Sequence, residues 1–209
     1  MTRPLLIFAK APVAGTVKTR LIPALGAEGA RDLYIELLER TLRRTAGWPG
    51  PRVLYCAPDS TAAYFTEAAE RHRLQLRTQR GADLGARMQS AFEDNPDGAL
   101  LIGSDCPELQ LEHLQRAERA LADHEVAILP SEDGGYVLIG LRQPCSAPFD
   151  GMSWSHADVL SDTRQRLDAA RLSLWVGPTL WDVDEAGDVA RYRALTTGSA
   201  AATPPSKAR

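Results

Sequence analysis

Short apolar runs alternate along this chain with longer segments of helical periodicity, and this alternation restricts the possible fold more than any other feature. Residues 5–9 form an apolar run typical of a buried strand, whereas apolar positions recur every three or four residues across 27–45. Ser60 and Ser155 are the expected N-caps of two later helices. The further strands expected are 53–57, 74–78, 99–103, 126–129, 136–141 and 172–176, and the further helices are 60–72, 110–123 and 156–171.

Strands that alternate with helices predict an α/β fold with a mainly parallel sheet covered on both faces. The chain has 209 residues, which are enough for one sizeable domain and too few for two independent domains of ordinary size. The stretch 198–209 is rich in Ala, Thr, Pro and Ser and is expected to be disordered. Ligands of such sheets bind beyond the carboxyl ends of the strands, so we look for function in the loops that follow them.

Composition and charge exclude several classes of protein. The formal net charge of -3 provides no global basic field for DNA or RNA. Three widely spaced cysteines form neither a disulfide framework nor a C-x-x-C metal pattern, so reduced thiols are expected. No segment approaches the roughly 20 apolar residues that span a bilayer, and the N-terminal run is too short for a signal peptide. We expect a cytoplasmic protein without membrane insertion or a nucleic-acid partner; a homo-oligomer remains open.

A basic loop follows the first expected strand. Lys10, Lys18 and Arg20 lie within eleven residues, and no acidic residue occurs before Glu28. Gly15 would let the backbone approach a ligand closely, while the ammonium and guanidinium groups suit phosphate oxygens. The spacing is neither that of a Walker A loop nor G-x-G-x-x-G. The loop is therefore predicted to bind nucleotide phosphates; the alternative is a solvated basic surface loop.

Carboxylates follow two of the later expected strands. Asp105 comes directly after the apolar run 99–103, and Asp182 and Asp184 follow the last strand at a spacing that puts both on one side of an extended segment. Mg²⁺ is typically held by one or two carboxylates together with substrate phosphates. The sequence thus makes these residues candidate metal ligands. Each could instead be a turn or helix-capping residue.

Two other segments offer polar groups beside flexible backbone. Asp83, Gly85 and Arg87 lie between a strand and a helix and could contact a base or ribose, although an ordinary loop and helix start would look the same. The second segment is a tight turn with a carboxylate and a phenol, which could also be a hairpin turn without function. The candidate acceptor-binding residues are the residues of this turn, Asp133, Gly134, Gly135 and Tyr136, together with Trp154.

Together these segments resemble a bacterial family that is usually labelled glycosyltransferase and is sometimes found beside radical-SAM genes. It is identified as a member of the nucleotide-diphospho-sugar transferase superfamily, and phospholactate and molybdenum-cofactor guanylyltransferases are similar, more distant relatives. The resemblance covers about residues 4–195. The matching motifs are Lys10-x-Pro12-x-x-Gly15-x-Val17-Lys18-Thr19-Arg20-Leu21, Asp83-Leu84-Gly85-x-Arg87-Met88, Gly103-x-Asp105-x-Pro107 and Asp133-Gly134-Gly135-Tyr136-x-Leu138-Ile139-Gly140.

The resemblance implies one Rossmann-like domain over 1–197, a three-layer α/β/α sandwich with the mixed, mainly parallel sheet of the glycosyltransferase-A fold. Residues up to about 103 would hold the nucleotide, and residues from about 104 the metal and the acceptor. By this analogy Gly15, Lys18 and Arg20 line the phosphates and Asp105 and Asp184 hold Mg²⁺ or Mn²⁺. The D-x-D motif common in glycosyltransferases is absent after Gly103, because Asp105 is followed by Cys106 and Pro107.

Three functions fit these expectations. The first is glycosyl transfer from a nucleotide sugar to a small-molecule acceptor, with Lys18, Arg20 and Asp105 as the catalytic candidates. The second is nucleotidyl transfer from a nucleoside triphosphate to a phosphorylated or hydroxyl acceptor, with release of pyrophosphate. The third is a nucleotide-binding protein without catalysis, since binding and catalysis would use the same loop residues.

Overall fold

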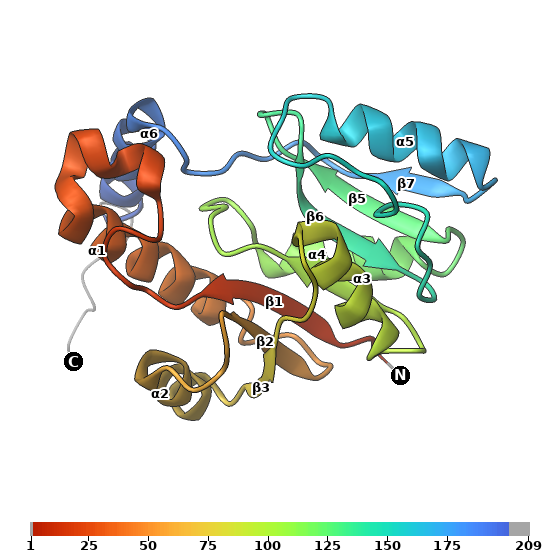
Figure 1. The fold of residues 1–209 in the computed structure, drawn as a ribbon, viewed down its shortest axis with the longest axis horizontal. Helices are drawn as coiled ribbons and strands as arrows, with labels where there is room; N and C mark the ends of the chain where they lie inside the picture. Colours follow the sequence, from red (N-terminus) through yellow and green to blue (C-terminus); the bar gives the residue numbers. More distant parts are fainter. Residues whose placement is uncertain (1, 201–209) are drawn as a thin grey trace, which may run out of the picture.

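A seven-stranded sheet forms the centre of the molecule in the computed structural model, which describes residues 2–200. The strand order is β3-β2-β1-β4-β6-β5-β7, and only β6 runs antiparallel to its neighbours. In sequence order the strands are β1 (Leu5–Lys10), β2 (Arg52–Ala57), β3 (Gln75–Thr78), β4 (Ala99–Ile102), β5 (Val126–Pro130), β6 (Tyr136–Leu141) and β7 (Leu174–Val176). Figure 1 shows this sheet crossing the molecule between the helices.

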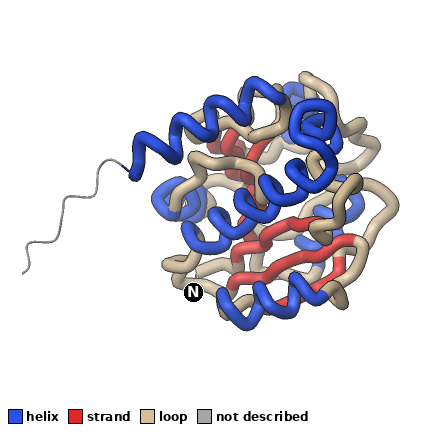
Figure 2. Tube along the Cα trace, turned by 90° about the vertical axis from the view of Figure 1, so that its left-hand side faces the viewer, coloured by secondary structure: helices blue, strands red, loops and turns tan. Residues whose placement is uncertain are grey.

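Helices cover both faces of the sheet, as Figures 1 and 2 show. They are α1 (Ile22–Arg44), α2 (Ala63–His72), α3 (Leu84–Glu93), α4 (Leu111–Ala120), α5 (Val159–Ala169) and α6 (Ala186–Ala200), with a 3₁₀ turn, η1 (Thr19–Leu21), before α1. Successive strand side chains point to opposite faces. Thus Leu5 and Ile7 pack in the cluster with α1, α2 and α4, whereas Leu6 and Phe8 pack with α3 and α5. The predicted three-layer α/β/α sandwich is confirmed.

The helix α6 packs on α1 rather than on the sheet. Buried Leu33 and Leu37 of α1 share a cluster with Val189 and Tyr192 of α6 and with Trp181 of the connecting segment. In Figure 1 this segment crosses from β7 to α6 along one end of the sheet. The connection therefore brings residues that follow the last strand back to the start of the chain.

The expected strands agree with the observed ones to within two residues at either end, but two predicted caps are wrong. The N-cap of α2 is Ala62 rather than Ser60, and that of α5 is Asp158 rather than Ser155. The helix α1 also begins before residue 27, with one turn that ends at Gly26 (φ 72°). Of the stretch expected to be disordered, residues 198–200 belong to α6, and 201–209 lie outside the described residues.

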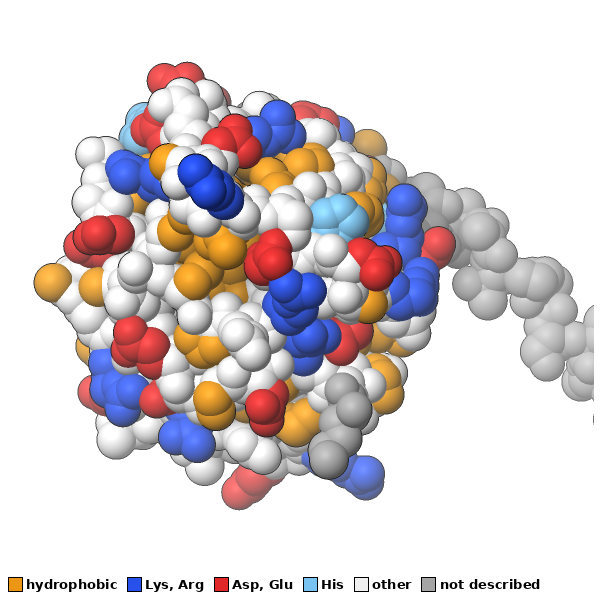
Figure 3. Space-filling view, turned by 90° about the vertical axis from the view of Figure 1, so that its right-hand side faces the viewer, with side chains coloured by type: hydrophobic (Ala, Val, Ile, Leu, Met, Phe, Trp, Pro, Cys, Tyr) orange, Lys and Arg blue, Asp and Glu red, His pale blue; other side chains and the backbone are white. Residues whose placement is uncertain are grey.

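Charged side chains of both signs are interspersed on the face drawn in Figure 3, and no single area of one sign dominates its described part. This distribution agrees with the small net charge of -3. Among residues 2–200, none of the helices combines the length and the apolar character that crossing a membrane requires.

Candidate functional site

A cavity of about 910 Å³ opens at the carboxyl ends of β1 and β4, which are neighbours in the sheet. The chain leaves β1 toward β2 and β3 on one side, and β4 begins the other side, so this is the point where the strand order reverses. Open α/β sheets bind their ligands at such points. The cavity is lined by residues of the loops after β1, β3, β4, β5 and β7 and by the segment before α5.

Lys18 is a buried lining residue of this cavity. Its side chain is 3% exposed, and its Nζ donates to Asp105 Oδ2 at 2.5 Å and to Asp184 Oδ1 at 3.3 Å. Its backbone is left-handed (φ 47°, ψ 43°), a conformation that costs a non-glycine residue about 1–2 kcal/mol. Strain of this kind is kept where surrounding contacts determine it, and it clusters at functional sites. Arg20 donates to the other oxygen of Asp184, at 2.5 Å.

Two segments far apart in sequence hold the carboxylates in place. The hydroxyl of Ser104 donates to Asp105 Oδ1 at 2.8 Å, and the N–H of Val183 donates to the Asp105 carbonyl at 3.1 Å. The N–H of Asp184 donates to Asp188 Oδ2 at 3.0 Å, which fixes the start of α6. The segment after β4 and the segment before α6 are thus joined directly at the site.

Burial and charge shift the pKa values of these groups in opposite directions. Burial lowers the pKa of Lys18, but the charges and hydrogen bonds of Asp105 and Asp184 together outweigh it, so the pKa of Lys18 is raised. Burial raises the pKa of Asp105, but the Lys18 charge and the hydrogen bonds from Lys18 and Ser104 together outweigh it, so the pKa of Asp105 is lowered. Both groups are therefore charged at neutral pH. For Asp182, burial and the nearby Asp105 charge raise the pKa to about 7.

The carboxylates fit the divalent cation that the family resemblance implies. Asp105 and Asp184 both face the Lys18 ammonium, so their oxygens converge on one cation-sized position. Mg²⁺ and Mn²⁺ prefer such oxygen ligands, and Mg²⁺ is often held jointly with substrate phosphates. Within residues 2–200 no three side chains of the metal-binding types converge. A cation here would thus need ligand oxygens in addition to Asp105 and Asp184.

Five of the seven predicted nucleotide-binding residues contact the cavity. Lys10, Lys18, Arg20, Asp83 and Arg87 line the cavity. Asp83 also caps α3, because its side chain accepts from Ala86 N at 2.9 Å, and Arg87 donates to Gly81 O at 3.1 Å.

The two predicted glycines, Gly15 and Gly85, lie outside the cavity lining. Gly15 has a positive φ of 84° in the loop turn. At Gly85 a Cβ would come within 2.8 Å of Trp154 Nε1, so the absence of a side chain lets the indole pack against α3.

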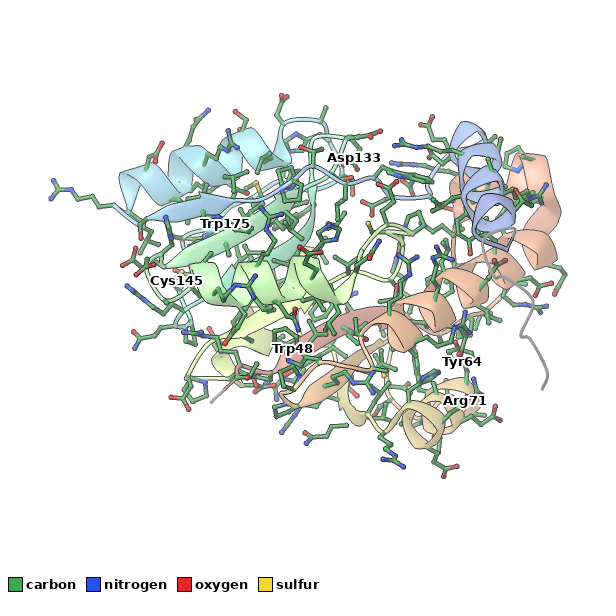
Figure 4. All side chains as sticks on the ribbon, turned by 180° about the vertical axis from the view of Figure 1, so that it is seen from behind. Trp48, Tyr64, Arg71, Asp133, Cys145 and Trp175 are labelled. Carbon is green, nitrogen blue, oxygen red and sulfur yellow. The ribbon has the colours of Figure 1, made fainter. Side chains whose placement is uncertain are left out.

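Most predicted acceptor residues line the same cavity. Asp133, Gly135, Tyr136 and Trp154 are in contact with it, whereas Gly134 is not. Gly134 has a φ of 88° and packs against the segment before α5, where its Cβ would overlap the Ala157 carbonyl. The rings of Tyr136 and Trp154 form an edge-to-face pair with centroids 6.5 Å apart. Figure 4 shows Asp133 at the end of the sheet that faces α1 and α6.

Sequence reasoning missed four polar residues that support the site. Ser104 lies next to Asp105 in sequence, so the adjacent hydroxyl was a usable signal. Ser131 donates to Asp182 Oδ2 at 3.0 Å across 51 residues, and no local pattern indicates such a contact. Tyr34 of α1 accepts from Lys10 N at 2.8 Å, and Gln79 donates to Ala9 O at 3.2 Å. Both residues hold the end of β1 in place.

Comparison with known proteins supports this architecture. Residues 41–156 match the model of a family described as "Uncharacterized protein conserved in bacteria (DUF2064)". A solved structure from Desulfovibrio desulfuricans G20, of a protein provisionally named a nucleotide-diphospho-sugar transferase, is 33% identical over 88% of this chain and 84% of its own, with a TM-score of 0.79. No curated protein matches the chain.

Two more distant structures share the fold. A nucleotidyl transferase from Methanothermobacter is 16% identical, with 95% of this chain and 99% of its own covered and a TM-score of 0.69. The 4-diphosphocytidyl-2C-methyl-D-erythritol synthase from Anaerococcus prevotii is 11% identical, with 94% and 96% covered and a TM-score of 0.63. At these identities the likeness concerns the fold alone.

The strand order, the antiparallel β6 and the position of the cavity define a member of the nucleotide-diphospho-sugar transferase superfamily. Within that superfamily the chain belongs to the DUF2064 family.

Proposed function

We propose that this protein is a transferase that binds the phosphates of an activated nucleotide against Lys18 and Arg20. The observation that carries the proposal is the Lys18 ammonium, buried and strained between Asp105 and Asp184 where β1 and β4 end. Phosphate oxygens arriving there would meet two cations. We further propose that it acts in the cytoplasm with Mg²⁺ or Mn²⁺ held by Asp105 and Asp184, with Asp182 as the alternative second ligand.

The reaction that we propose first is glycosyl transfer from a nucleotide sugar. An acceptor oxygen would form a bond to the anomeric carbon and lose its proton, while the bond from that carbon to the diphosphate breaks and the nucleoside diphosphate leaves with the electron pair. Lys18 and Arg20 would stabilise the charge that develops on the leaving group. A bound divalent cation would neutralise the same charge. Support comes from the name of the 33% identical protein and from a cavity large enough for both substrates.

Nucleotidyl transfer is the second candidate. Here the acceptor oxygen would bond to the α-phosphorus of a nucleoside triphosphate, and pyrophosphate would leave. The observation that favours it lies after β4. The second aspartate position of a D-x-D motif that begins at Asp105 is occupied by Pro107, and burial raises the pKa of the intervening Cys106 thiol to about 12, so neither residue adds a ligand beside Asp105. Three cations in the loop 10–20 also suit a triphosphate.

Thermal unfolding with a panel of nucleoside triphosphates and nucleotide sugars, each with and without Mg²⁺ or Mn²⁺, tests the proposal. At about 100 times Kd a ligand stabilises the folded protein by about 2.7 kcal/mol, which is a rise in Tm of roughly 5–10 °C at this size. Product analysis then separates the two reactions, because nucleoside diphosphate indicates glycosyl transfer and pyrophosphate indicates nucleotidyl transfer. A panel without any shift contradicts both, and binding without either product leaves a non-catalytic nucleotide-binding protein.

A further inference from the structure

Trp154 joins two parts of the site that the sequence assigns to different substrates. It lies in the segment before α5 and is a predicted acceptor residue, yet its indole packs on the first turn of α3. This turn follows Asp83 and carries Arg87, two predicted nucleotide-binding residues that line the same cavity as Trp154. The contact between Trp154 and α3 therefore connects the predicted nucleotide-binding residues with the predicted acceptor-binding ones.

The indole reaches α3 because residue 85 has no side chain. Gly85 is the second residue of α3, and a Cβ there would lie 2.8 Å from Trp154 Nε1 and 2.9 Å from Trp154 Cζ2. The φ of Gly85 is not positive, so its backbone conformation does not require glycine. A glycine within a helix lowers stability relative to alanine. What this glycine provides is thus the space for the indole.

The segment that carries Trp154, residues 153–157, has few other attachments, and we call it the lid segment. Among residues 2–200, no backbone hydrogen bond joins the lid segment to another part of the chain. Its ends are held, because Met152 and Val159 are buried and Ala157 packs against the turn between β5 and β6. Between these ends, the position of the lid segment depends on where the indole docks.

The docked position of the indole carries two unfavourable features. Trp154 Nε1 is buried, and within residues 2–200 it has no hydrogen-bond partner. A buried donor of this kind has lost its bonds to water and gained none in return. Ser155, the next residue, has a left-handed φ of 67°, which is strained for a residue with a Cβ. Both features reduce the free-energy advantage of the docked position, so a ligand that contacts this position can shift the population toward it.

We propose that a bound nucleotide stabilises the docked position of Trp154 and thereby orders the lid segment at the cavity; this inference rests on the proposed transferase function. Leu84 and Arg87 of α3 line the cavity together with Trp154, and Leu84 is 44% exposed. A base or ribose that contacts α3 and the docked indole at once gains contacts that the undocked position does not offer. Residues 155–157 also line the cavity, so Trp154 is a positioning residue that couples nucleotide binding to the acceptor surface.

Fluorine NMR of the full chain labelled with 5-fluorotryptophan follows the docking directly. The sequence has four tryptophans, and the resonance that is missing in Trp154→Phe belongs to Trp154. The probes, each with Mg²⁺, are ATP, CTP, GTP, UTP, UDP-glucose, GDP-mannose and ADP-glucose. A nucleotide that raises Tm should shift and narrow the Trp154 resonance, because one docked position replaces a mixture. The resonance of Trp48, whose Nε1 donates to Arg3 O at 3.0 Å outside the cavity lining, should stay in place.

Variants that prevent docking test the coupling to nucleotide affinity. Gly85→Ala places a Cβ against the indole, a side chain that can swing away without unfolding α3. Because coupling is reciprocal, we expect Kd for the nucleotide to rise at least about fivefold, and Trp154→Ala should raise it equally. The double variant should bind no more weakly than either single one, because both remove the same contact. Gly187→Ala, also at the second residue of its helix but with open space for a Cβ, should stay within about twofold of the wild type.

The outcomes distinguish this inference from the proposed function. A Trp154 resonance that does not respond to a nucleotide that raises Tm would overturn the inference and leave the nucleotide site intact. So would wild-type affinity in either single variant, or losses that multiply in the double variant, which would mean that Gly85→Ala distorts α3 itself. If Gly85→Ala does not fold, the Trp154 resonance and the affinity of Trp154→Ala decide. Absence of a rise in Tm with every nucleotide would instead remove the transferase function, and the coupling with it.

Discussion

At the scale of single residues, Lys18 combines an unfavourable backbone with a favourable side-chain environment. The left-handed conformation at φ 47° costs a residue with a Cβ about 1–2 kcal/mol, and two carboxylates hold the ammonium in return. If the ion pairs served only to stabilise the fold, the residue at position 18 would not need a strained, left-handed backbone conformation. The position of the charge, rather than the stability of the loop, is what the conformation secures.

A pair of substitutions at Lys18 separates these two effects. Lys18→Ala and Lys18→Gly both remove the ammonium and should weaken nucleotide binding by about 1–3 kcal/mol, the scale of a lost charge-assisted hydrogen bond. Glycine tolerates a positive φ, so Lys18→Gly should be about 1 kcal/mol more stable than Lys18→Ala. Urea denaturation and nucleotide titration measure both quantities. Equal stability of the two variants, or nucleotide affinity like that of the wild type, would contradict this account.

Asp105 gives the corresponding test of the metal. Asp105→Asn keeps the hydrogen bond from Ser104 in reach but removes the charge that faces Lys18. We expect the metal-dependent part of the nucleotide-induced shift in Tm to disappear, because an amide is a weaker ligand than a carboxylate for Mg²⁺. A metal-dependent shift that persists in the variant would show that Asp105 does not hold the cation.

Outside the site, Glu39 of α1 anchors α2 through three side chains. It accepts from His72 at 2.8 Å, Arg71 at 2.6 Å and Tyr64 at 3.2 Å, and Figure 4 labels Tyr64 and Arg71 on α2. Burial raises the pKa of Glu39, but the contacts with His72 and Arg71 outweigh it, so the pKa is lowered. A lowered pKa means that this stability is present above the unfolded-state pKa and is lost as the pH falls through the folded-state pKa.

Glu39→Gln should therefore cost about 1–2 kcal/mol at pH 7 and progressively less below about pH 4, where the wild-type carboxyl becomes protonated. Urea denaturation across this pH range measures the difference. Glu67→Gln, on the exposed side of α2, the helix that Glu39 contacts, is the control and should stay within about 0.5 kcal/mol at every pH. A gap between wild type and Glu39→Gln that does not change with pH would be evidence against an ionised Glu39.

At the scale of elements, the sequence predicts where strands lie better than where helices begin. The strands are apolar runs between turn residues, so their ends follow from composition. Helix starts depend on which side chain reaches a free backbone N–H. Before α2, Asp59 accepts from Thr61 N at 2.8 Å while Ser60 contacts Thr78. Before α5, the His156 ring accepts from Asp158 N, and the helix begins later than expected.

The turn between β5 and β6 shows how one residue can fix the contact between two elements. Gly134 has a φ of 88°, and a Cβ there would lie 1.8 Å from the Ala157 carbonyl oxygen. Gly134→Ala should destabilise the protein by more than about 2 kcal/mol, because it adds backbone strain and forces the segment before α5 away. The rate of transfer to the acceptor should fall as well, since Asp133 and Trp154 flank this contact.

The control for this substitution is Gly187→Ala in the first turn of α6. A Cβ at Gly187 meets nothing within 4 Å, and its φ is not positive. Replacing glycine by alanine within a helix should stabilise by about 0.5–1 kcal/mol. Thermal unfolding of the two variants should thus give changes of opposite sign. A Gly134→Ala protein as stable as the wild type would mean that the turn can move without cost.

At the scale of the whole molecule, the site exists because segments from the early and late parts of the chain meet. Lys18 and Asp184 are separated by 166 positions in sequence, and Lys18 and Asp105 by 87. Periodicity and motifs indicated each residue separately, with chemistry suited to phosphate and metal. Their pairing depends on α6 packing against α1, which no local pattern in either segment encodes. The predicted residues could therefore be named from the sequence, but the ion pairs that join them could not.

This arrangement couples the packing of α6 to ligand binding. Tyr192 of α6 is 2% exposed, and its hydroxyl donates to Glu36 of α1 at 2.6 Å. Tyr192→Ala should cost about 3–5 kcal/mol through loss of the buried ring. Because the segment that carries Asp184 leads into α6, the variant should also bind the Mg²⁺–nucleotide more weakly at a temperature where it is still folded. Bound nucleotide should slow amide hydrogen exchange in α6 of the wild type.

Tyr192→Phe is the control that separates packing from hydrogen bonding. It keeps the ring between α1 and α6 and loses only the bond to Glu36, at a cost of about 1 kcal/mol. Its nucleotide affinity and its exchange protection in α6 should match those of the wild type. If Tyr192→Ala bound nucleotide as tightly as Tyr192→Phe, the position of α6 would be irrelevant to the site. If nucleotide left exchange in α6 unchanged, Asp184 would take no part in holding the ligand.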